Sequence, residues 1–73
     1  MEKPTVTEFK IQRTRCGFTQ EGLAQVATAS GTPIRQEYVS LLDRGLLPRP
    51  AEARTLAEIL GVSQEKLFGK ERS

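Results

Sequence analysis

Residues 18–45 read FTQEGLAQVATASGTPIRQEYVSLLDRG and predict two helices joined by a short break. The first of these helices is predicted to begin at Thr19, because a threonine side chain caps the free N–H groups at a helix start. Phe18 and Leu23 have the spacing of a hydrophobic staple around this cap, which fixes the angle at which the chain enters the helix. The helix is predicted to fade around residues 28–30. Its inward side is predicted to consist of Leu23, Ala24 and Ala27.

The second helix of the pair is predicted to begin at Thr32 and Pro33. Threonine caps a helix, and proline at the first helical position has no N–H to leave unpaired. Gly45 is predicted to end it, because the proline-rich segment that follows cannot continue a helix. Its inward side is predicted to carry Val39, Leu42 and Leu46. The opposite, polar side is predicted to meet a partner and carries Gln36, Glu37, Ser40 and Arg44.

A bracing helix is predicted before this pair. Thr5 and Glu8 form a capping-box pattern at its start, and Gly17 is predicted to end it. Apolar and other inward residues recur along it at helical spacing. These residues are Val6, Phe9, Arg13 and Cys16.

Two more helices are predicted after the pair. A fourth helix is expected from Pro50 or Ala51 to Gly61, and a short fifth helix is expected after the capping residue Ser63. The fourth helix is predicted to bury Ala53, Leu56, Ala57 and Leu60, and the fifth to bury Leu67 and Phe68. The sequence therefore predicts a compact all-α fold of five helices.

Length and charge limit what this fold can do. The chain has 73 residues and a formal net charge of +2, with a pI near 9.0. We interpret it as a single domain, residues 1–73, with an ordered core of about residues 5–68. A chain of this length buries only about 60% of its unfolded surface, which leaves little room for an enclosed active site. The mild positive charge permits a nucleic-acid partner without requiring one.

Several classes of protein are disfavoured by composition. The chain has no histidine, and Cys16 is its single cysteine, predicted to be a small core residue. No catalytic pairing or glycine-rich phosphate loop is present, so we expect no enzyme, no metal site and no cofactor. No apolar run is long enough to span a membrane, and residues 1–9 do not resemble a signal peptide. These features favour a cytoplasmic binding protein.

The order of the motifs resembles the lambda-repressor-like, Cro/C1-type helix-turn-helix domain of the XRE family. The resemblance covers about Val6 to Phe68. It rests on several short pieces in the right order rather than on one specific motif. The matching pieces are Arg13, Gly17–Glu21, Leu23–Ala24, Asp43–Gly45, Pro48, Leu56–Ser63 and Leu67.

The resemblance implies a DNA-binding domain whose third helix lies in the major groove, usually as a dimer on a two-fold site. Gln20 matches the family's glutamine at the start of the second helix, which would hold a phosphate. Gln36 matches the glutamine at the start of the recognition helix, where it would bind an adenine edge. Arg13 and Asp43 match a family ion pair that joins the first helix to the end of the third.

The chain departs from the family pattern in three places. The connection between the second and third helices is longer, with residues 29–32 as the surplus. Leu46 and Leu47 replace a basic loop that follows the glycine in the family. Leu41 stands where many relatives carry a polar, base-reading residue.

The candidate site residues follow from the predicted third helix and its surroundings. Glu37 leaves two interpretations open, since its carboxylate can accept from a cytosine amino group or repel phosphates. The alternative for this helix is an ordinary solvated polar face. Ile34, Tyr38 and Leu41 widen the apolar arc of the helix, so in this interpretation part of the face packs against the protein instead of contacting bases. The base-contacting candidates are Gln36, Glu37, Ser40 and Leu41. The phosphate-contacting candidates are Gln20, Thr19, Arg35, Arg44 and Arg49, with Arg54 more weakly in the same set.

These observations predict a small bacterial or phage DNA-binding regulator, acting as a transcriptional repressor or switch. Its predicted partner is double-stranded DNA. If the protein forms a homodimer, we expect the domain itself to make the contact, and the dimer can be one that forms only on DNA. Two alternatives remain. The first is an adaptor that uses the same fold to bind protein. The second is a MerR-like reader, suggested by residues 44–50, which would need a strand wing after this run.

Overall fold

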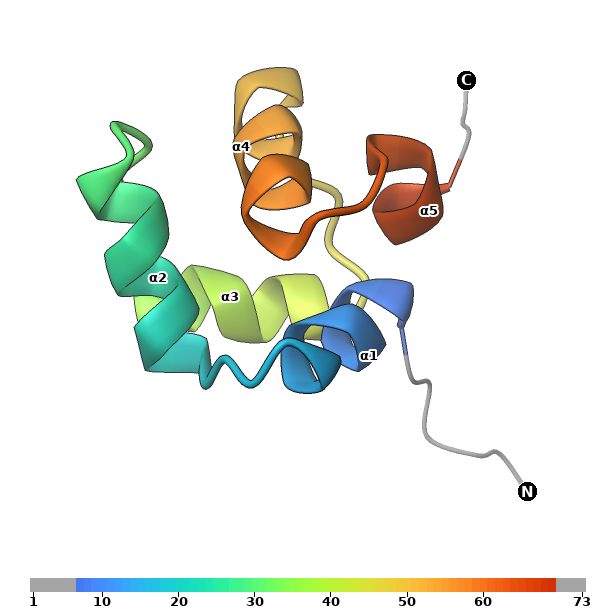
Figure 1. Ribbon diagram of the computed structural model, residues 1–73, viewed down its shortest axis with the longest axis horizontal. Coiled ribbons are helices and arrows are strands. Elements are labelled where there is room, and N and C mark those ends of the chain that lie inside the picture. Colours follow the sequence, from blue (N-terminus) through green and yellow to red (C-terminus); the bar gives the residue numbers. More distant parts are fainter. Residues whose placement is uncertain (1–6, 70–73) are drawn as a thin grey trace.

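The computed structural model describes residues 7–69, which form five α-helices and no strand (Figure 1). The all-α prediction is therefore confirmed for this part of the chain. The connections between consecutive helices are short. The helices are α1 (Glu8–Arg15), α2 (Gln20–Ala29), α3 (Gln36–Asp43), α4 (Pro50–Leu60) and α5 (Gln64–Phe68).

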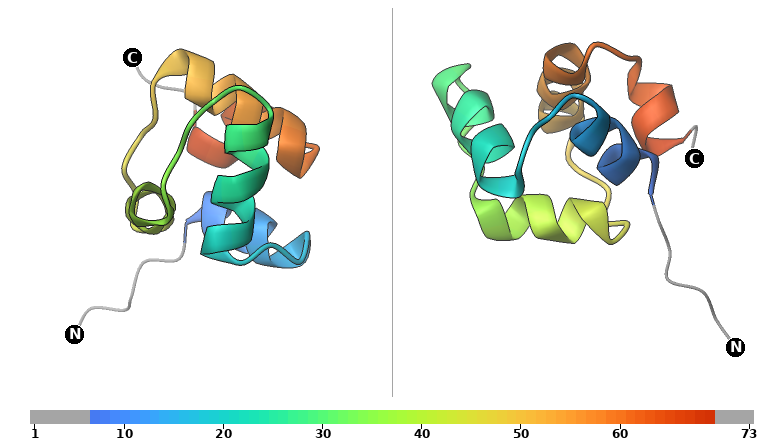
Figure 2. Two further views of the ribbon diagram at one scale, coloured as in Figure 1. Left: turned by 90° about the vertical axis from the view of Figure 1, so that its left-hand side faces the viewer. Right: turned by 60° about the horizontal axis from the view of Figure 1, so that its bottom comes forward.

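The helix α3 lies along one edge of the molecule (Figure 1, Figure 2). It packs against α2 and α1, whereas α4 packs against α2 and α5, and α5 also packs against α1. In both figures α4 and α5 lie on the side of the molecule opposite to α3. One side of α3 therefore faces away from the rest of the fold.

A single hydrophobic core joins the helices. Its largest fully buried side chains come from α1 to α4, so these helices share one interior. The helix α5 joins the core through buried Leu67, and the ring of Phe68 stacks on that of Phe9 with 5.8 Å between centroids. The fully buried side chains are Phe9, Leu23, Val39, Leu42 and Leu56.

Side-chain caps begin three of the helices. The predicted caps are confirmed at Thr19, which accepts from the N–H of Gly22, and at Ser63, which accepts from the N–H of Lys66. The first helix is capped by Thr7. The predicted cap Thr5 and the inward Val6 lie outside the described residues.

The predicted start of the third helix is wrong by several residues. Thr32 was expected to cap it, but α3 begins at Gln36, after Arg35 with extended backbone. The N–H of Thr32 instead bonds the carbonyl oxygen of Ala27 at 2.9 Å, and Gly31 has a φ of +98°. This is the Schellman geometry that closes a helix, so Thr32 belongs to the end of α2.

The connection between α2 and α3 is held by two threonine side chains. The Thr28 hydroxyl donates to the Ile34 carbonyl oxygen at 3.2 Å and accepts from the Ile34 N–H at 3.1 Å. The hydroxyls of Thr32 and Thr55 are 2.8 Å apart, and this hydrogen bond joins the connection to α4. Of the surplus residues, Ala29 ends α2, and residues 30–32 form the turn that closes this helix, so they add no further helical turn before α3.

Three burial predictions are also wrong. Cys16 is exposed, and Gln12, one turn earlier, takes the buried position instead, donating to the Leu60 carbonyl oxygen at 3.2 Å. Leu46 is 42% exposed because the chain turns at Gly45, with a φ of +114°, and leaves the helical face. Phe68 is only half-buried. The other inward residues predicted for α2 to α5 are buried, as expected.

Candidate nucleic-acid interface

The outer side of α3 carries the base-contacting candidates. Gln36 and Glu37 are exposed, Ser40 is half-buried, and Leu41 is 44% exposed. Gln36, Glu37 and Ser40 line a polar hollow of about 260 Å³ together with Gln20 of α2, and we call it the α3 hollow. The structure thus brings Gln36, Glu37 and Ser40 to one open hollow, whereas Leu41 is exposed but does not line it.

The widened apolar arc of the alternative interpretation separates into different environments. Ile34 is buried, but it precedes α3 and belongs to the connection. Tyr38 is half-buried and its hydroxyl donates to the Glu52 carboxylate on α4. Burial, followed by the hydrogen bond to Glu52 and the charge of that carboxylate, raises the pKa of Tyr38 to about 12. Leu41 alone of the three stays on the outer side of α3.

A buried polar network holds the C-terminal end of α3. The Arg13 guanidinium donates to both carboxylate oxygens of Asp43, with Nη2–Oδ2 at 2.7 Å and Nε–Oδ1 at 3.2 Å. Both side chains are less than a tenth exposed, so the two form a buried, bidentate ion pair. Arg13 also donates to the carbonyl oxygen of Phe18 at 2.8 Å, which satisfies a third N–H.

Gln20 belongs to the same network. Its side-chain Nε2 donates to Asp43 Oδ2 at 3.0 Å. An amide nitrogen carries two N–H groups, so one remains for another acceptor. Asp43 therefore fixes the orientation of the Gln20 amide next to the outer side of α3.

The remaining phosphate-contacting candidates lie around the two ends of α3. Arg35 is its N-terminal cap residue and Arg44 its C-terminal cap residue, and both are exposed. Arg49 is the exposed cap residue of α4, and Thr19 caps α2 with its hydroxyl oxygen. Arg54 is exposed on α4. The structure thus places one arginine at each end of α3.

Sequence reasoning missed one basic residue of this surface, Lys10. It lines a second polar hollow, of about 420 Å³, which we call the corner hollow because α1, α2 and α3 meet there. The sequence feature that could have pointed to Lys10 is its position three residues before Arg13, because residues at this spacing are neighbours on a helix surface. The corner hollow is lined by Lys10, Gln20, Ser40, Asp43 and Arg44.

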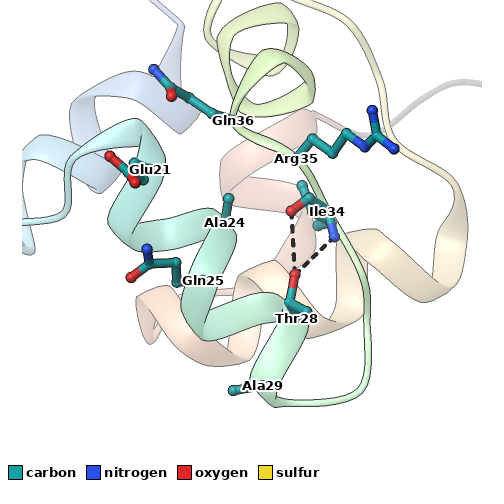
Figure 3. A pocket seen from close by; sticks show the side chains of 8 residues that line it. All are labelled: Glu21, Ala24, Gln25, Thr28, Ala29, Ile34, Arg35 and Gln36. Carbon is teal, nitrogen blue, oxygen red and sulfur yellow. Dashed lines mark hydrogen bonds between the residues drawn. The ribbon is translucent and has the colours of Figure 1, made fainter.

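A third, shallow hollow separates α2 from the start of α3 (Figure 3). It measures about 510 Å³ and runs between α2 and the segment before α3 that Thr28 binds. Gln36 lines both this hollow and the α3 hollow. Its lining residues are Glu21, Ala24, Gln25, Thr28, Ala29, Ile34, Arg35 and Gln36.

Comparison of the chain with known protein families, with curated proteins and with solved structures found no match. Within residues 7–69, no three His, Cys, Asp or Glu side chains are grouped as metal ligands. The longest of the helices α1–α5 has 11 residues, and none of them is long and apolar enough to cross a membrane.

Proposed function

We propose that this chain is a small transcriptional regulator that binds double-stranded DNA through a lambda-repressor-like helix-turn-helix, formed by α2 and α3. The observation that carries the proposal is the open outer side of α3, whose two ends are both fixed to neighbouring helices. A recognition helix must be presented in this way, because it reads base edges from within the groove.

The dimensions of α3 fit this role. An α-helix with its side chains is about 10–12 Å in diameter, and the eight residues of α3 form about two turns. The major groove of B-DNA is about 12 Å wide and admits an α-helix. The helices α4 and α5 lie on the side of the molecule opposite to α3, so we expect them to stay clear of a duplex that α3 enters.

The side chains of α3 favour readout of particular bases. Gln36 is the first residue of the helix, and the N-terminal residues of a recognition helix contact base edges. A glutamine there binds the N6 and N7 edge of adenine with two hydrogen bonds. Ser40 lies one turn farther on the same side. Leu41 offers apolar contact to a thymine methyl group. For Glu37 both interpretations remain open: its carboxylate accepts from a cytosine amino group, or it repels phosphates.

Phosphate contacts would flank this surface. Arg35 and Arg44 mark the two ends of α3, and the second N–H of Gln20 is free for a phosphate oxygen. Thr19 and Arg49 extend the same row at the starts of α2 and α4. Two copies would read a two-fold site, and a bacterial or phage regulator of this kind acts in the cytoplasm.

An adaptor that binds protein is the second candidate function. It is favoured by three exposed leucines near the end of α3, since exposed apolar clusters mark contact surfaces. The MerR-like alternative needs a strand after residues 44–50, where the chain instead forms α4. The exposed leucines are Leu41, Leu46 and Leu47, at 44%, 42% and 60%.

A titration with random duplex DNA at low and then moderate salt tests the proposal. A DNA-binding domain should bind at low salt and weaken steeply as salt rises, because it releases counterions from the phosphates. Selection from a random pool should then enrich a defined sequence. Absence of binding at both salt concentrations, with the fold retained, would instead support the adaptor.

A further inference from the structure

We infer that Lys10, Gln20, Ser40 and Arg44 bind one backbone phosphate of the DNA in the corner hollow. This inference rests on the proposed function. It assigns one of the phosphate contacts to a specific binding position, which we call the seat at the corner hollow. Lys10 is the new member, since it lies on α1, outside the helix pair that reads DNA.

The corner hollow gathers positive charge from separate elements. Lys10 comes from α1 and Arg44 from the C-terminal cap of α3, and both side chains are exposed around one polar depression of about 420 Å³. Two cations that line the same hollow repel each other, and an anion bound between them adds two attractions that outweigh this repulsion. The arrangement therefore favours an anionic occupant.

Asp43 is the one acidic residue that lines the hollow, and it does not cancel this charge. Both of its oxygens accept from Arg13, which does not line the hollow, and one of them also accepts from Gln20. Arg13 neutralises Asp43 within a buried pair. The charges of Lys10 and Arg44 consequently have no anionic partner among the other residues that line the hollow.

The hollow also offers fixed neutral donors. Gln20 has a second N–H while its first is held by Asp43, so the amide is already oriented before a ligand arrives. Binding to such a group costs less ordering entropy than binding to a free side chain. The Ser40 hydroxyl adds a donor that can rotate toward a phosphate oxygen.

The position of the hollow favours a phosphate of DNA over free phosphate. Gln20 and Ser40 line both the corner hollow and the α3 hollow, where Gln36 and Glu37 face outward. An occupant of the corner hollow is thus adjacent to the surface proposed to meet base edges. This is the place of a phosphate on the wall of the groove that α3 enters.

The salt dependence of DNA affinity tests this seat. Binding to the selected duplex is measured across a salt series for the unchanged protein, Lys10→Gln and Lys66→Gln. The control Lys66→Gln removes the same charge from exposed α5. Lys10→Gln should flatten the log–log slope by about 0.9, the value for one lost phosphate contact, while Lys66→Gln leaves it unchanged. Arg44→Gln should behave like Lys10→Gln.

A neutral phosphate locates the contact. Methylphosphonate substitutions are placed one at a time along the duplex. One position per half-site should weaken binding of the unchanged protein more than binding of Lys10→Gln, which has already lost one contact to that phosphate. Inorganic phosphate at matched ionic strength should displace no more DNA than chloride does. Stronger displacement by phosphate would assign the hollow to the free anion and overturn the inference.

The two levels of the proposal fail differently. If the unchanged protein binds no duplex at low salt, the proposed function is wrong. If it binds steeply and Lys10→Gln keeps the same slope, the DNA-binding function stands and the seat at the corner hollow is wrong.

Discussion

At its C-terminal end α3 is joined to α1 and α2 by a buried ion pair, whereas at its N-terminal end it is joined to α2 by neutral hydrogen bonds. The first contact, which we call the charged joint, consists of Arg13, Asp43 and Gln20. The second, which we call the neutral joint, consists of the Thr28 hydroxyl bonded to both backbone groups of Ile34. A buried charge left without its partner costs far more than a neutral group, so the two joints should differ in strength. Both orient the same helix.

The charged joint should give the largest effect on stability. Arg13→Ala leaves the Asp43 carboxylate buried without its cation, which should lower the free energy of unfolding by about 3–5 kcal/mol. Chemical denaturation measures the loss. As a control, the double variant Arg13→Met/Asp43→Leu removes both charges and should recover much of it. A midpoint for Arg13→Ala close to that of the unchanged protein would contradict a buried, coupled pair.

The neutral joint should come second. Thr28→Val keeps the shape of the side chain but leaves the part-buried N–H and carbonyl of Ile34 without their partner, at a cost of about 1–3 kcal/mol. Thr28→Ser retains the hydroxyl and should keep most of the stability.

The same variant tests whether Thr28 positions the outer side of α3, which we propose to contact base edges. Because Ile34 lies two residues before Gln36, Thr28→Val should reduce the preference for the selected duplex over random duplex. If both affinities change equally, the neutral joint contributes only stability.

The link from the connection to α4 should matter less. Thr32→Val and Thr55→Val each remove one part-buried hydroxyl pair and should cost about 0.5–1.5 kcal/mol. Because they remove the same bond, the double variant should be less destabilised than the sum of the two single variants. Strictly additive losses would show that the two hydroxyls do not interact.

The smallest effect at neutral pH concerns the contact of α3 with α4. Tyr38 is the single tyrosine, so ultraviolet absorbance follows its ionisation alone. Its pKa is raised from 10.0 to about 12, because burial and the bond to Glu52 favour the neutral phenol.

A raised pKa in the folded state means that the stabilisation is complete below about pH 10 and is lost as the pH rises toward about 12. The phenol should therefore titrate higher in the folded protein than in denaturant. Glu52→Gln should lower the folded value, and identical curves for folded and denatured protein would contradict the contact.

The sequence predicted the charged joint but not the neutral one, for a physical reason. Arg13 and Asp43 were assigned from matching motif positions, and the caps Thr19 and Ser63 act on backbone groups three residues away. The cap relations are local and therefore visible in the sequence, whereas the Arg13–Asp43 pair joins residues 30 positions apart and was predicted only through the family resemblance.

The start of α3 depended on competition instead. The Thr32 N–H was expected at a helix start, yet it closes α2, and its hydroxyl bonds Thr55, 23 residues away. Lys10 was missed in a similar way, because its relation to Arg44 depends on how α1 packs beside α3. Where no family resemblance supplies them, partners distant in sequence become visible only in the folded chain.

The central claim is that the outer side of α3 reads base edges, and Gln36→Ala tests it most directly. Affinities for the selected duplex and for random duplex are compared in the unchanged protein, in Gln36→Ala and in Gln64→Ala, a control that truncates an exposed glutamine on α5. Gln36→Ala should lose about 1–3 kcal/mol of preference for the selected duplex, and the loss of specificity should be confined to one base pair. Its affinity for random DNA should change little. Unchanged discrimination in Gln36→Ala, or an equal loss in both variants, would contradict the claim.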